Sequence, residues 1–388
     1  MTILPEPSSF ALKHSEKLKA HIRQDIEAAG GLIDFARFME LALYAPGLGY
    51  YTSGTHKLGR AGDFVTAPEL SPLFAACMAK QFQEIFKIID QKNILEFGAG
   101  SGIFARDVLF ELEKLNGLPE HYYILEVSAD LRERQLLRFK TECPQFLSRI
   151  VWLDALPKSF NGIMFANEVL DAMPVHRFEW HQGEITECFV GFEQNQFVFR
   201  SGPSSDALKK RVLAISENTT WPDFYSSEIS LIHPAWIKSL ADCLEQGVIL
   251  LVDYGYGRRE YYHPERQQGT LTCFYQHHRH ADPLILPGLQ DITAHVDFTT
   301  IADSADEAGL SVSGFTTQAA FLLACGMLDI AQKNPLNAVD RYKQNQIIKT
   351  LTLPSEMGEV VKVMALSRKM EMEWAGFLLK DRRPDLTF

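Results

Sequence analysis

Residues 93–102, NILEFGAGSG, combine glycines at alternate positions with a carboxylate two residues ahead of them. Glycines at a turn from a strand to a helix let a ligand approach the backbone, close to the free amides of the helix. A dinucleotide fingerprint would place a further glycine three residues after Gly100, but Ile103 stands there. Glu96 is poorly suited to a pyrophosphate and well suited to a ligand with positive charge and amine donors.

Two further acids stand at the ends of the next predicted strands. Glu126 could hold a ribose diol with its two oxygens, and Asp154 could reach an adenine amine. S-Adenosylmethionine carries these groups together with a sulfonium, an ammonium and no phosphate, so it fits the acids better than a dinucleotide does. The remaining alternative is an ordinary turn whose acids are surface charges. The predicted cofactor-binding residues are Glu96, Gly98, Gly100, Ser101, Gly102, Glu126, Asp154 and Asn167.

The fourth predicted strand ends in ANEVLDAMPVH, the next place where a side chain can face a transferred methyl group. Many N-methyltransferases carry Asn or Asp followed by two prolines at this point, whereas this chain has Asn167 and Glu168 without an adjacent proline. One interpretation gives these residues a role at the methyl group. In the other, Asn167 caps a helix, and Glu168 and Asp171 are solvated acids of its first turn. The residues alone leave the two open.

Apolar strands alternate with helices from residue 93 onward, which is typical of a parallel sheet with both faces covered. We therefore predict an α/β fold with a mostly parallel, doubly wound, Rossmann-like sheet. Two late strands around an apolar helix would close this sheet as an antiparallel pair. The predicted strands span residues 93–97, 122–128, 150–155, 162–168, 247–255, 310–318 and 359–367, with helices at 103–115, 130–139 and 321–328.

Residues 175–246 interrupt this rhythm with three short strand-like runs and two helical stretches. They indicate an inserted α+β subdomain built on an antiparallel hairpin or meander. Ahead of the sheet, residues 18–29, 33–44 and 71–88 predict helices, and a glycine-rich segment separates the second helix from the third. We therefore divide the chain into an N-terminal helical segment, 1–90, and a main domain, 91–388, with an insertion at about 175–246.

Composition limits the partners and the compartment. The formal net charge of −11 argues against nucleic acid, which needs a basic footprint, but it allows a cationic peptide. The six cysteines lie far apart without a C-x-x-C pair, which fits free thiols in a reducing compartment. The N-terminus lacks the pattern of a signal peptide, and the longest apolar run, residues 319–328, is too short to span a bilayer. We expect a cytoplasmic protein without a membrane span.

The histidines raise a separate question. His277, His278 and His280 stand together, but no recognisable metal-ligand spacing accompanies them and the segment is predicted to be a loop, so we expect no metal. His295 follows the fifth of the parallel strands, and its loop can fold over the ligand end of the sheet. It is a candidate proton acceptor or peptide-binding residue, with a hydrogen-bonded structural histidine as the alternative.

Several segments together resemble the MidA-like family, in the order in which that family carries them. They are GRAGDFVTAPELSPLFA, LEFGAGSG, ANEVLDAMPVHRF, LVDYGY and DITAHVDFT, and the resemblance runs from about residue 31 to the last strand. It implies a class I S-adenosylmethionine-dependent methyltransferase that methylates a protein arginine. In the mitochondrial members the substrate is a core subunit of respiratory complex I. Without an Arg- and Ser-rich transit peptide, the chain is similar to a bacterial member.

The resemblance also assigns roles to individual residues. Gly98, Gly100 and Gly102 match the cofactor turn, and Glu126 matches the ribose acid. A signature loop that would cover the cofactor includes Gly62, Asp63, Thr66, Pro68 and Glu69, of which Thr66 and Pro68 join the predicted cofactor site. Asn167, Glu168 and Asp171 match the family's Asn-Glu followed by Asp-Ala-x-Pro.

On this basis Glu168 and Asp171, one helical turn apart, would both reach one guanidinium and hold the nitrogens that do not react. The predicted catalytic residues are Glu168, Asp171 and His295. The alternatives are a non-catalytic assembly factor that binds the cofactor and a small-molecule methyltransferase. The intact glycine turn favours an enzyme, and the insertion with the long loop at 258–297 favours a macromolecular substrate. Monomer and homodimer stay open.

Overall fold

The computed structural model describes residues 4–53, 66–333, 335–370 and 372–387. Its core is a sheet of eight strands in the order β15-β16-β10-β5-β2-β3-β4, with the short β14 beside the end of β10. Neighbours from β10 to β4 run parallel, and β16 is antiparallel to both β10 and β15. The strands are β2 (Asn93–Phe97), β3 (His121–Leu125), β4 (Ile150–Leu153), β5 (Phe160–Asn167), β10 (Leu244–Tyr256), β14 (Val296–Asp297), β15 (Ser311–Thr317) and β16 (Val361–Arg368).

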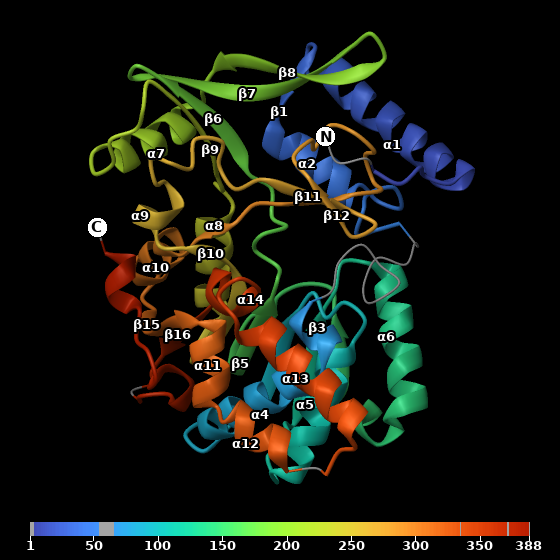
Figure 1. Ribbon diagram of the computed structural model, residues 1–388, viewed down its shortest axis with the longest axis vertical. Coiled ribbons are helices and arrows are strands. Elements are labelled where there is room, and N and C mark those ends of the chain that lie inside the picture. Colours follow the sequence, from blue (N-terminus) through green and yellow to red (C-terminus); the bar gives the residue numbers. More distant parts are fainter. Residues whose placement is uncertain (1–3, 54–65, 334, 371, 388) are drawn as a thin grey trace.

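This arrangement confirms the predicted fold, including the closing antiparallel pair. Helices cover both faces of the sheet because its central strands are apolar on both sides (Figure 1). One face packs against α4 (Pro72–Phe86), α5 (Ile103–Lys114), α6 (Ala129–Glu142), α11 (Gln318–Ala324), α13 (Ala338–Thr352) and α14 (Met357–Val360). The other packs against α8 (His233–Cys243) and α10 (Phe298–Glu307). Shorter helices are α12 (Met327–Gln332), η1 (Pro144–Arg149), η2 (Ala375–Phe377) and η3 (Arg383–Leu386).

A second, antiparallel sheet lies beyond the carboxyl ends of the parallel strands (Figure 1). Its strands are β1 (Leu32–Asp34), β6 (His176–His181), β7 (Glu184–Glu193), β8 (Gln196–Pro203) and β9 (Phe224–Ile229). Helices α1 (Ser9–Ala28), α2 (Phe35–Tyr44) and α7 (Asp206–Ser216) pack on it. The sequence analysis predicted neither β1 nor β9. β1 has three residues and pairs with β7 of the insertion, whereas β9 lies within the insertion and pairs with β6.

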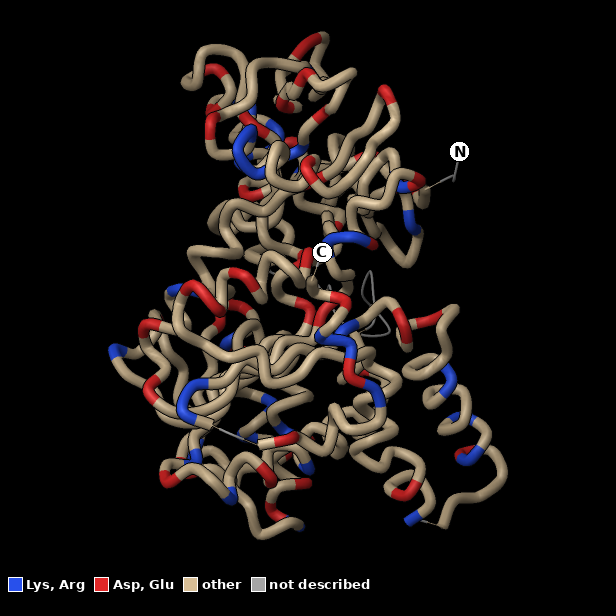
Figure 2. The backbone as a smooth tube through the Cα atoms, turned by 90° about the vertical axis from the view of Figure 1, so that its left-hand side faces the viewer, with Lys and Arg blue, Asp and Glu red and all other residues tan. Residues whose placement is uncertain are grey.

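The N-terminal segment therefore divides between the two layers. Helices α1 and α2 share a core with the insertion, while α4 packs on the central sheet. The short helix α3 (Ala67–Leu70) precedes α4. Acidic and basic residues are interspersed along the backbone of both layers rather than gathered on one basic face (Figure 2). None of the helices in the described part of the chain is both long and apolar enough to cross a bilayer.

The segment between β10 and β14 contains a third small sheet rather than a loop alone. It comprises β11 (Thr272–Tyr275), β12 (His278–His280) and β13 (Asp291–Thr293), preceded by α9 (Arg258–Tyr261). The predicted loop around the three histidines was wrong. Gln276 and His277 adopt positive φ angles of 45° and 62° and form a two-residue hairpin turn. Turns of this type usually contain glycine, and this one has none, so the sequence pattern did not predict it.

Candidate active site

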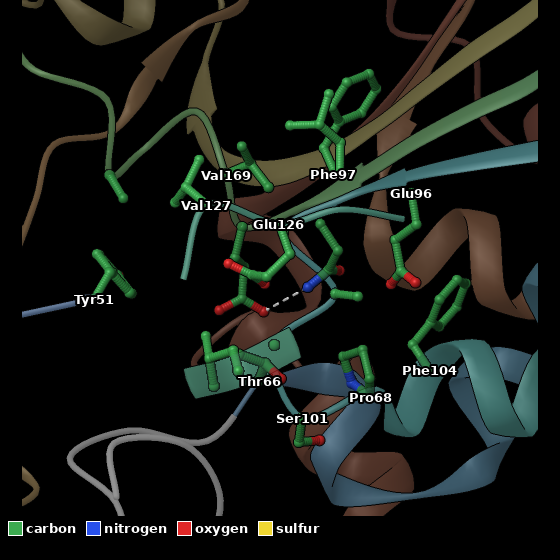
Figure 3. A pocket seen from close by; sticks show the side chains of 18 of the residues that line it. Tyr51, Thr66, Pro68, Glu96, Phe97, Ser101, Phe104, Glu126, Val127 and Val169 are labelled. Atoms are coloured by element: carbon green, nitrogen blue, oxygen red, sulfur yellow. Dashed lines mark hydrogen bonds between the residues drawn. The ribbon is translucent and has the colours of Figure 1, made fainter. Parts of the chain in front are cut away.

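A cavity of about 320 Å³ lies where the carboxyl ends of the parallel strands meet the second layer. In open α/β sheets this is the edge at which ligands bind. Phe97 and Val169 lie on one side of it, Thr66, Pro68 and Ser101 on the opposite side, and Tyr51 on a third side (Figure 3). The predicted residues that line it are Thr66, Pro68, Glu96, Gly98, Gly100, Ser101, Glu126, Asn167 and Glu168.

The turn between β2 and α5 forms part of the floor of the cavity. Gly98, Gly100 and Gly102 have φ angles of 61°, 53° and 77°, a region that side chains with a Cβ rarely adopt. Gly102 is the N-cap of α5, and its helix amides therefore lie next to the cavity. The hydroxyl of Ser101 donates a hydrogen bond to Glu69 on α3, which holds the end of the signature loop against the turn.

Two carboxylates face the cavity from the ends of neighbouring strands. Burial, and then the proximity of Glu126, raises the pKa of Glu96 to about 8, although a hydrogen bond from the Tyr122 hydroxyl at 2.9 Å works in the opposite direction. Burial also raises the pKa of Glu126, which accepts hydrogen bonds from the Ser128 amide at 3.0 Å and from Gln135 at 3.2 Å. Neither acid is stabilised by an ion pair in the described part of the chain, so a cationic ligand would stabilise both.

Gln135, which the sequence analysis missed, joins the predicted cofactor residues to one another. Its amide nitrogen donates to the carbonyl of Gly100 at 2.9 Å as well as to Glu126, and its oxygen accepts from the Trp152 indole at 2.9 Å. One fully buried side chain on α6 thus fixes the glycine turn relative to the second acid. The sequence around Gln135 is that of an ordinary charged helix and did not indicate a role at the site, because the residues that surround Gln135 come from three separate elements.

The signature loop is described only at its end. Thr66 is the N-cap position of α3, Pro68 lies in its first turn, and both line the cavity. The amide of Ala67 donates a hydrogen bond to the carboxylate of Glu168, so α3 and the end of β5 meet across the cavity. Gly62 and Asp63, which the resemblance placed in the same loop, lie outside the described residues.

Asn167 and Glu168 end β5 in a turn rather than in a helix. Glu168 has a φ of 52°, an uncommon backbone angle for a residue with a side chain, and the Asn167 amide donates to its carboxylate at 3.1 Å. Both interpretations of the motif assumed a helix here, and both were wrong on that point. No helix begins at Asn167, and Asp171 is buried rather than solvated.

A buried carboxylate, rather than Asn167, satisfies the backbone amides of this turn. One oxygen of Asp253, at the end of β10, accepts from the amides of Val169, Leu170 and Asp171 at 3.0, 2.8 and 3.4 Å. Its other oxygen accepts from the amide of the next residue at 2.9 Å, and the side chain is 0% exposed. These bonds hold the turn that carries Glu168, because three consecutive amides would otherwise be buried without partners.

Four carboxyl groups gather at this end of the cavity, and we call them the acid cluster: Glu168, Asp171, Asp253 and Asp291. Burial and then Asp253 raise the pKa of Glu168 to about 8. Burial, Asp253 and Glu168 raise the pKa of Asp171 well above its ordinary value, and burial raises that of Asp253 to about 7. In the described part of the chain no Lys, Arg or His forms an ion pair with Glu168, Asp171 or Asp253.

Aromatic side chains from the second layer complete the wall beside the acid cluster. The rings of Tyr44 and Tyr51 stack with centroids 5.5 Å apart. The Tyr51 hydroxyl donates to Asp291 at 2.8 Å, and the Tyr44 hydroxyl donates to the carbonyl of Ala172 at 3.0 Å. Trp236 on α8 also lines the cavity, with its ring centroid 5.4 Å from that of Phe97. The sequence analysis missed all three aromatic residues, because each comes from a segment that gave no sign of the site.

Four predicted site residues do not line the cavity: Gly102, Asp154, Asp171 and His295. The side chain of Asp154 is 89% exposed and pairs with Arg132 at 2.6 Å, since β4 ends one residue earlier and the chain turns outward. His295 packs against Tyr254 and Tyr256, with ring centroids 6.2 and 5.2 Å away. The described residues contain no group of three His, Cys, Asp or Glu side chains placed to hold a metal ion.

The known proteins that are similar to this chain include methyltransferases. A family model described as S-adenosyl-L-methionine-dependent methyltransferase matches residues 77–316. A crystal structure from Burkholderia thailandensis bound to S-adenosyl-homocysteine is 38% identical, covers 98% of this chain and 100% of that one, and superposes with a TM-score of 0.94.

Curated relatives extend the likeness to named enzymes. The protein arginine methyltransferase NDUFAF7 homolog of Drosophila melanogaster is 29% identical, over 93% of this chain and 87% of its own length. The human protein arginine methyltransferase NDUFAF7 is 26% identical, over 89% of this chain and 82% of its own length. The likeness therefore spans both layers of the structure.

Proposed function

Because the chain belongs to the family of S-adenosyl-L-methionine-dependent methyltransferases, we propose that it transfers a methyl group to an arginine side chain of a protein substrate. The cofactor is S-adenosylmethionine, which supplies an electrophilic methyl group on a sulfonium. The described residues fit this cofactor. Glycines with positive φ leave its place open, Glu96 and Glu126 are buried carboxylates without ion pairs, and the amides of α5 lie nearby.

The choice of arginine rests on Glu168, Asp171 and Asp253, which lie together largely out of solvent and have no cationic side chain as an ion-pair partner in the described part of the chain. Buried carboxylates are unfavourable unless they are protonated, hydrogen-bonded or paired with a positive charge. A guanidinium stays protonated in proteins and presents five N–H donors in one plane, so it can pair with more than one carboxylate at once. The names of the curated relatives, protein arginine methyltransferases, support the same choice.

The residues of the acid cluster would orient the acceptor and receive its proton. Glu168, which faces the cavity, would pair with a nitrogen that does not react, and the buried Asp171 would add negative charge behind it. Methylation of a guanidinium nitrogen releases one N–H proton. In the free protein Glu168 has a pKa of about 8 and holds a proton at neutral pH. Binding of the guanidinium beside it would displace that proton, and the resulting carboxylate would accept the N–H proton that methylation releases. Tyr44 and Tyr51 would exclude water from this end of the cavity.

The sequence resemblance also suggests which protein is methylated and in which compartment, and we include both in the proposal. A core subunit of respiratory complex I is the substrate that the resemblance implies, and a cytoplasmic location goes with a bacterial member. Comparing methylarginine peptides from cells with and without the gene would test this. Loss of methylarginine from a complex I subunit supports the assignment, and its loss from an unrelated protein alone would refute it.

The activity itself is tested with purified protein, S-adenosylmethionine labelled in the methyl group, and matched peptides that differ only in Arg or Lys. We expect labelled methylarginine and no methyllysine. A lysine ammonium has one nitrogen, which cannot pair with the carboxylates and also face the methyl group, whereas a guanidinium has separate nitrogens for the two tasks. Transfer to lysine alone would refute the arginine assignment. Transfer to neither, despite tight cofactor binding, would favour a non-catalytic assembly factor or a small-molecule enzyme.

A further inference from the structure

Beyond the acid cluster, three basic side chains converge on the end of β10. The guanidinium carbon of Arg266 lies 4.1 Å from the centre of the Tyr256 ring, and Nζ of Lys362 lies 5.0 Å from the same centre. Arg279 on β12 completes what we call the basic cluster. Burial, and then these three cations, lowers the pKa of His295 to about 3, so this histidine is neutral and adds no charge.

The basic cluster lacks carboxylate partners. In the described part of the chain, none of its three members lies within ion-pair distance of an acid. The acids nearest to Lys362 pair elsewhere, since Glu260, Glu359 and Asp385 contact Arg382 at 3.9, 3.3 and 2.5 Å. Among the described residues, the three positive charges therefore lie together with no carboxylate in direct contact. Glu260, Glu359 and Asp385 are close enough to offset only part of the effect of burial on the pKa of Lys362.

Lys362 shows that this arrangement is unfavourable without a ligand. Its side chain is 1% exposed, and within the described ranges its ammonium donates to the backbone carbonyls of Glu359 and Val360 alone. Burial lowers its pKa to about 8, which means that the charge is poorly compensated. Arg266 is half-buried and Arg279 is exposed, so an anion could reach the basic cluster from solvent. An anion would relieve both the repulsion and the lost hydration.

Tyr254 connects the basic cluster to the acid cluster. Its ring stacks on His295 at a centroid distance of 6.2 Å, and His295 in turn contacts Tyr256. Burial, and then the carboxyl groups of Glu168 and Asp171, raises the pKa of Tyr254, so its hydroxyl lies beside the acid cluster. Strands β11 and β12 lie across this end of the central sheet (Figure 1). A chain that inserts an arginine between Tyr44 and Glu168 would therefore have neighbouring residues near the basic cluster.

We propose that the basic cluster is an anion subsite that binds an acidic side chain of the protein substrate, a few residues from the methylated arginine. This inference rests on the proposed function. The two clusters have opposite charge, so a substrate with Arg and Glu at the right spacing is oriented in one direction and not the other. The subsite selects which arginine of a protein reaches the acid cluster.

The experiment compares arginine peptides in which one glutamate is moved through about four positions on either side of the arginine, a span of roughly 14 Å in each direction. Each peptide has a partner with Gln in place of Glu. We expect one position at which Glu raises kcat/KM about tenfold over Gln, the usual size of one charge-assisted hydrogen bond, through KM rather than kcat. Arg266→Gln should remove this advantage and leave the rate with the Gln peptide unchanged.

Arg341→Gln is the matched control, because it removes the same charge from an exposed position on α13. It should keep the preference for Glu, and Arg279→Gln should weaken it. If the Gln peptides are methylated but no glutamate position helps, the subsite is refuted while the proposed function stands. The same holds if Arg266→Gln slows both peptides equally. If no arginine peptide is methylated, both proposals fail together.

Discussion

Glu168 shows how a single residue depends on its surroundings. Its backbone lies in the left-handed region, its amide donates to the carbonyl of Val252 at 2.8 Å, and its side chain accepts from Asn167 and Ala67. Strained backbone of this kind persists where surrounding contacts enforce it, and Asp253 supplies those contacts through three amides. The carboxylate is thus held at the cavity before any substrate binds.

Glu168→Gln tests this residue, because it keeps the shape and removes the ionisable carboxyl group. We expect the affinity for S-adenosylmethionine to stay nearly unchanged and kcat to fall about a hundred- to a thousandfold, or about 2.7–4 kcal/mol of barrier. The pre-aimed contact to the guanidinium is lost while the cofactor turn stays intact. Kinetics with an arginine peptide, together with calorimetric titration of the cofactor, measure the two effects separately.

The control is Asp154→Asn, which removes a carboxylate from the end of β4, the edge strand of the same sheet, outside the cavity. It should leave both kcat and cofactor affinity unchanged. A Glu168→Gln enzyme with normal turnover would remove this residue from the mechanism, and with it the main structural reason for preferring arginine.

At the scale of elements, the turn from β2 to α5 decides whether the cofactor can enter. Its three glycines all have positive φ, and the cap position of α5 is one of them. A side chain here would be strained and would also occupy the cavity. Gly102 has a second constraint, since an added Cβ would lie 3.2 Å from Cγ of Gln135, the residue that ties the turn to Glu126.

Gly100→Val is the corresponding prediction. A β-branched residue at a φ of 53° costs on the order of 1–3 kcal/mol, and its methyl groups would fill the space next to the backbone. We expect a folded protein with slightly lower Tm and no detectable binding of S-adenosylmethionine by calorimetry. Gly117→Val is the matched control, because an added Cβ there meets only ordinary contacts of 3.6 Å or more. Normal cofactor binding by Gly100→Val would show that the turn is not the binding site.

At the scale of the whole molecule, the buried acids link stability to pH. The folded protein holds Glu96 and Glu168 with pKa values of about 8 and Asp253 with a pKa of about 7, whereas these groups have pKa values of about 4 in an unfolded chain. Between these limits the folded state binds more protons than the unfolded state. Stability is therefore greatest at the acidic end of this window and falls as the pH rises toward 8.

We expect the Tm of the cofactor-free protein to fall between pH 5 and pH 8, a window that follows from these pKa values. Calorimetric melting across this range measures it. The double variant Glu96→Gln, Glu168→Gln should show a shallower fall, because two of the groups no longer titrate. Saturating S-adenosylmethionine should restore part of the stability at pH 8 by compensating charge near Glu96. An equally steep fall in the double variant would contradict this account.

The central sheet and the cofactor turn could be predicted from the amino-acid sequence alone. Their signals are local: apolar strands of about five residues, a glycine triplet that needs positive φ, and acids directly at strand ends. Residues 93–97 and the turn that follows them lie where the pattern predicts. The same local reasoning misplaced Asp154, because a strand end does not fix the direction in which the next side chain points.

Tertiary structure alone decided the substrate side of the cavity. The turn at Asn167–Asp171 contains residues that could begin a helix, but Glu168 has a left-handed φ of 52° and its amide donates to the carbonyl of Val252 on β10. Asp253, 82–84 residues away, accepts from the next three amides and stabilises this turn. Tyr51 meets Asp291 across 240 residues, and β1 becomes a strand only beside β7. Such contacts join groups that are distant in the chain, so no window of sequence contains both partners. The charge of the site follows from them, because burial and mutual proximity, rather than residue type, raise the pKa values of its acids.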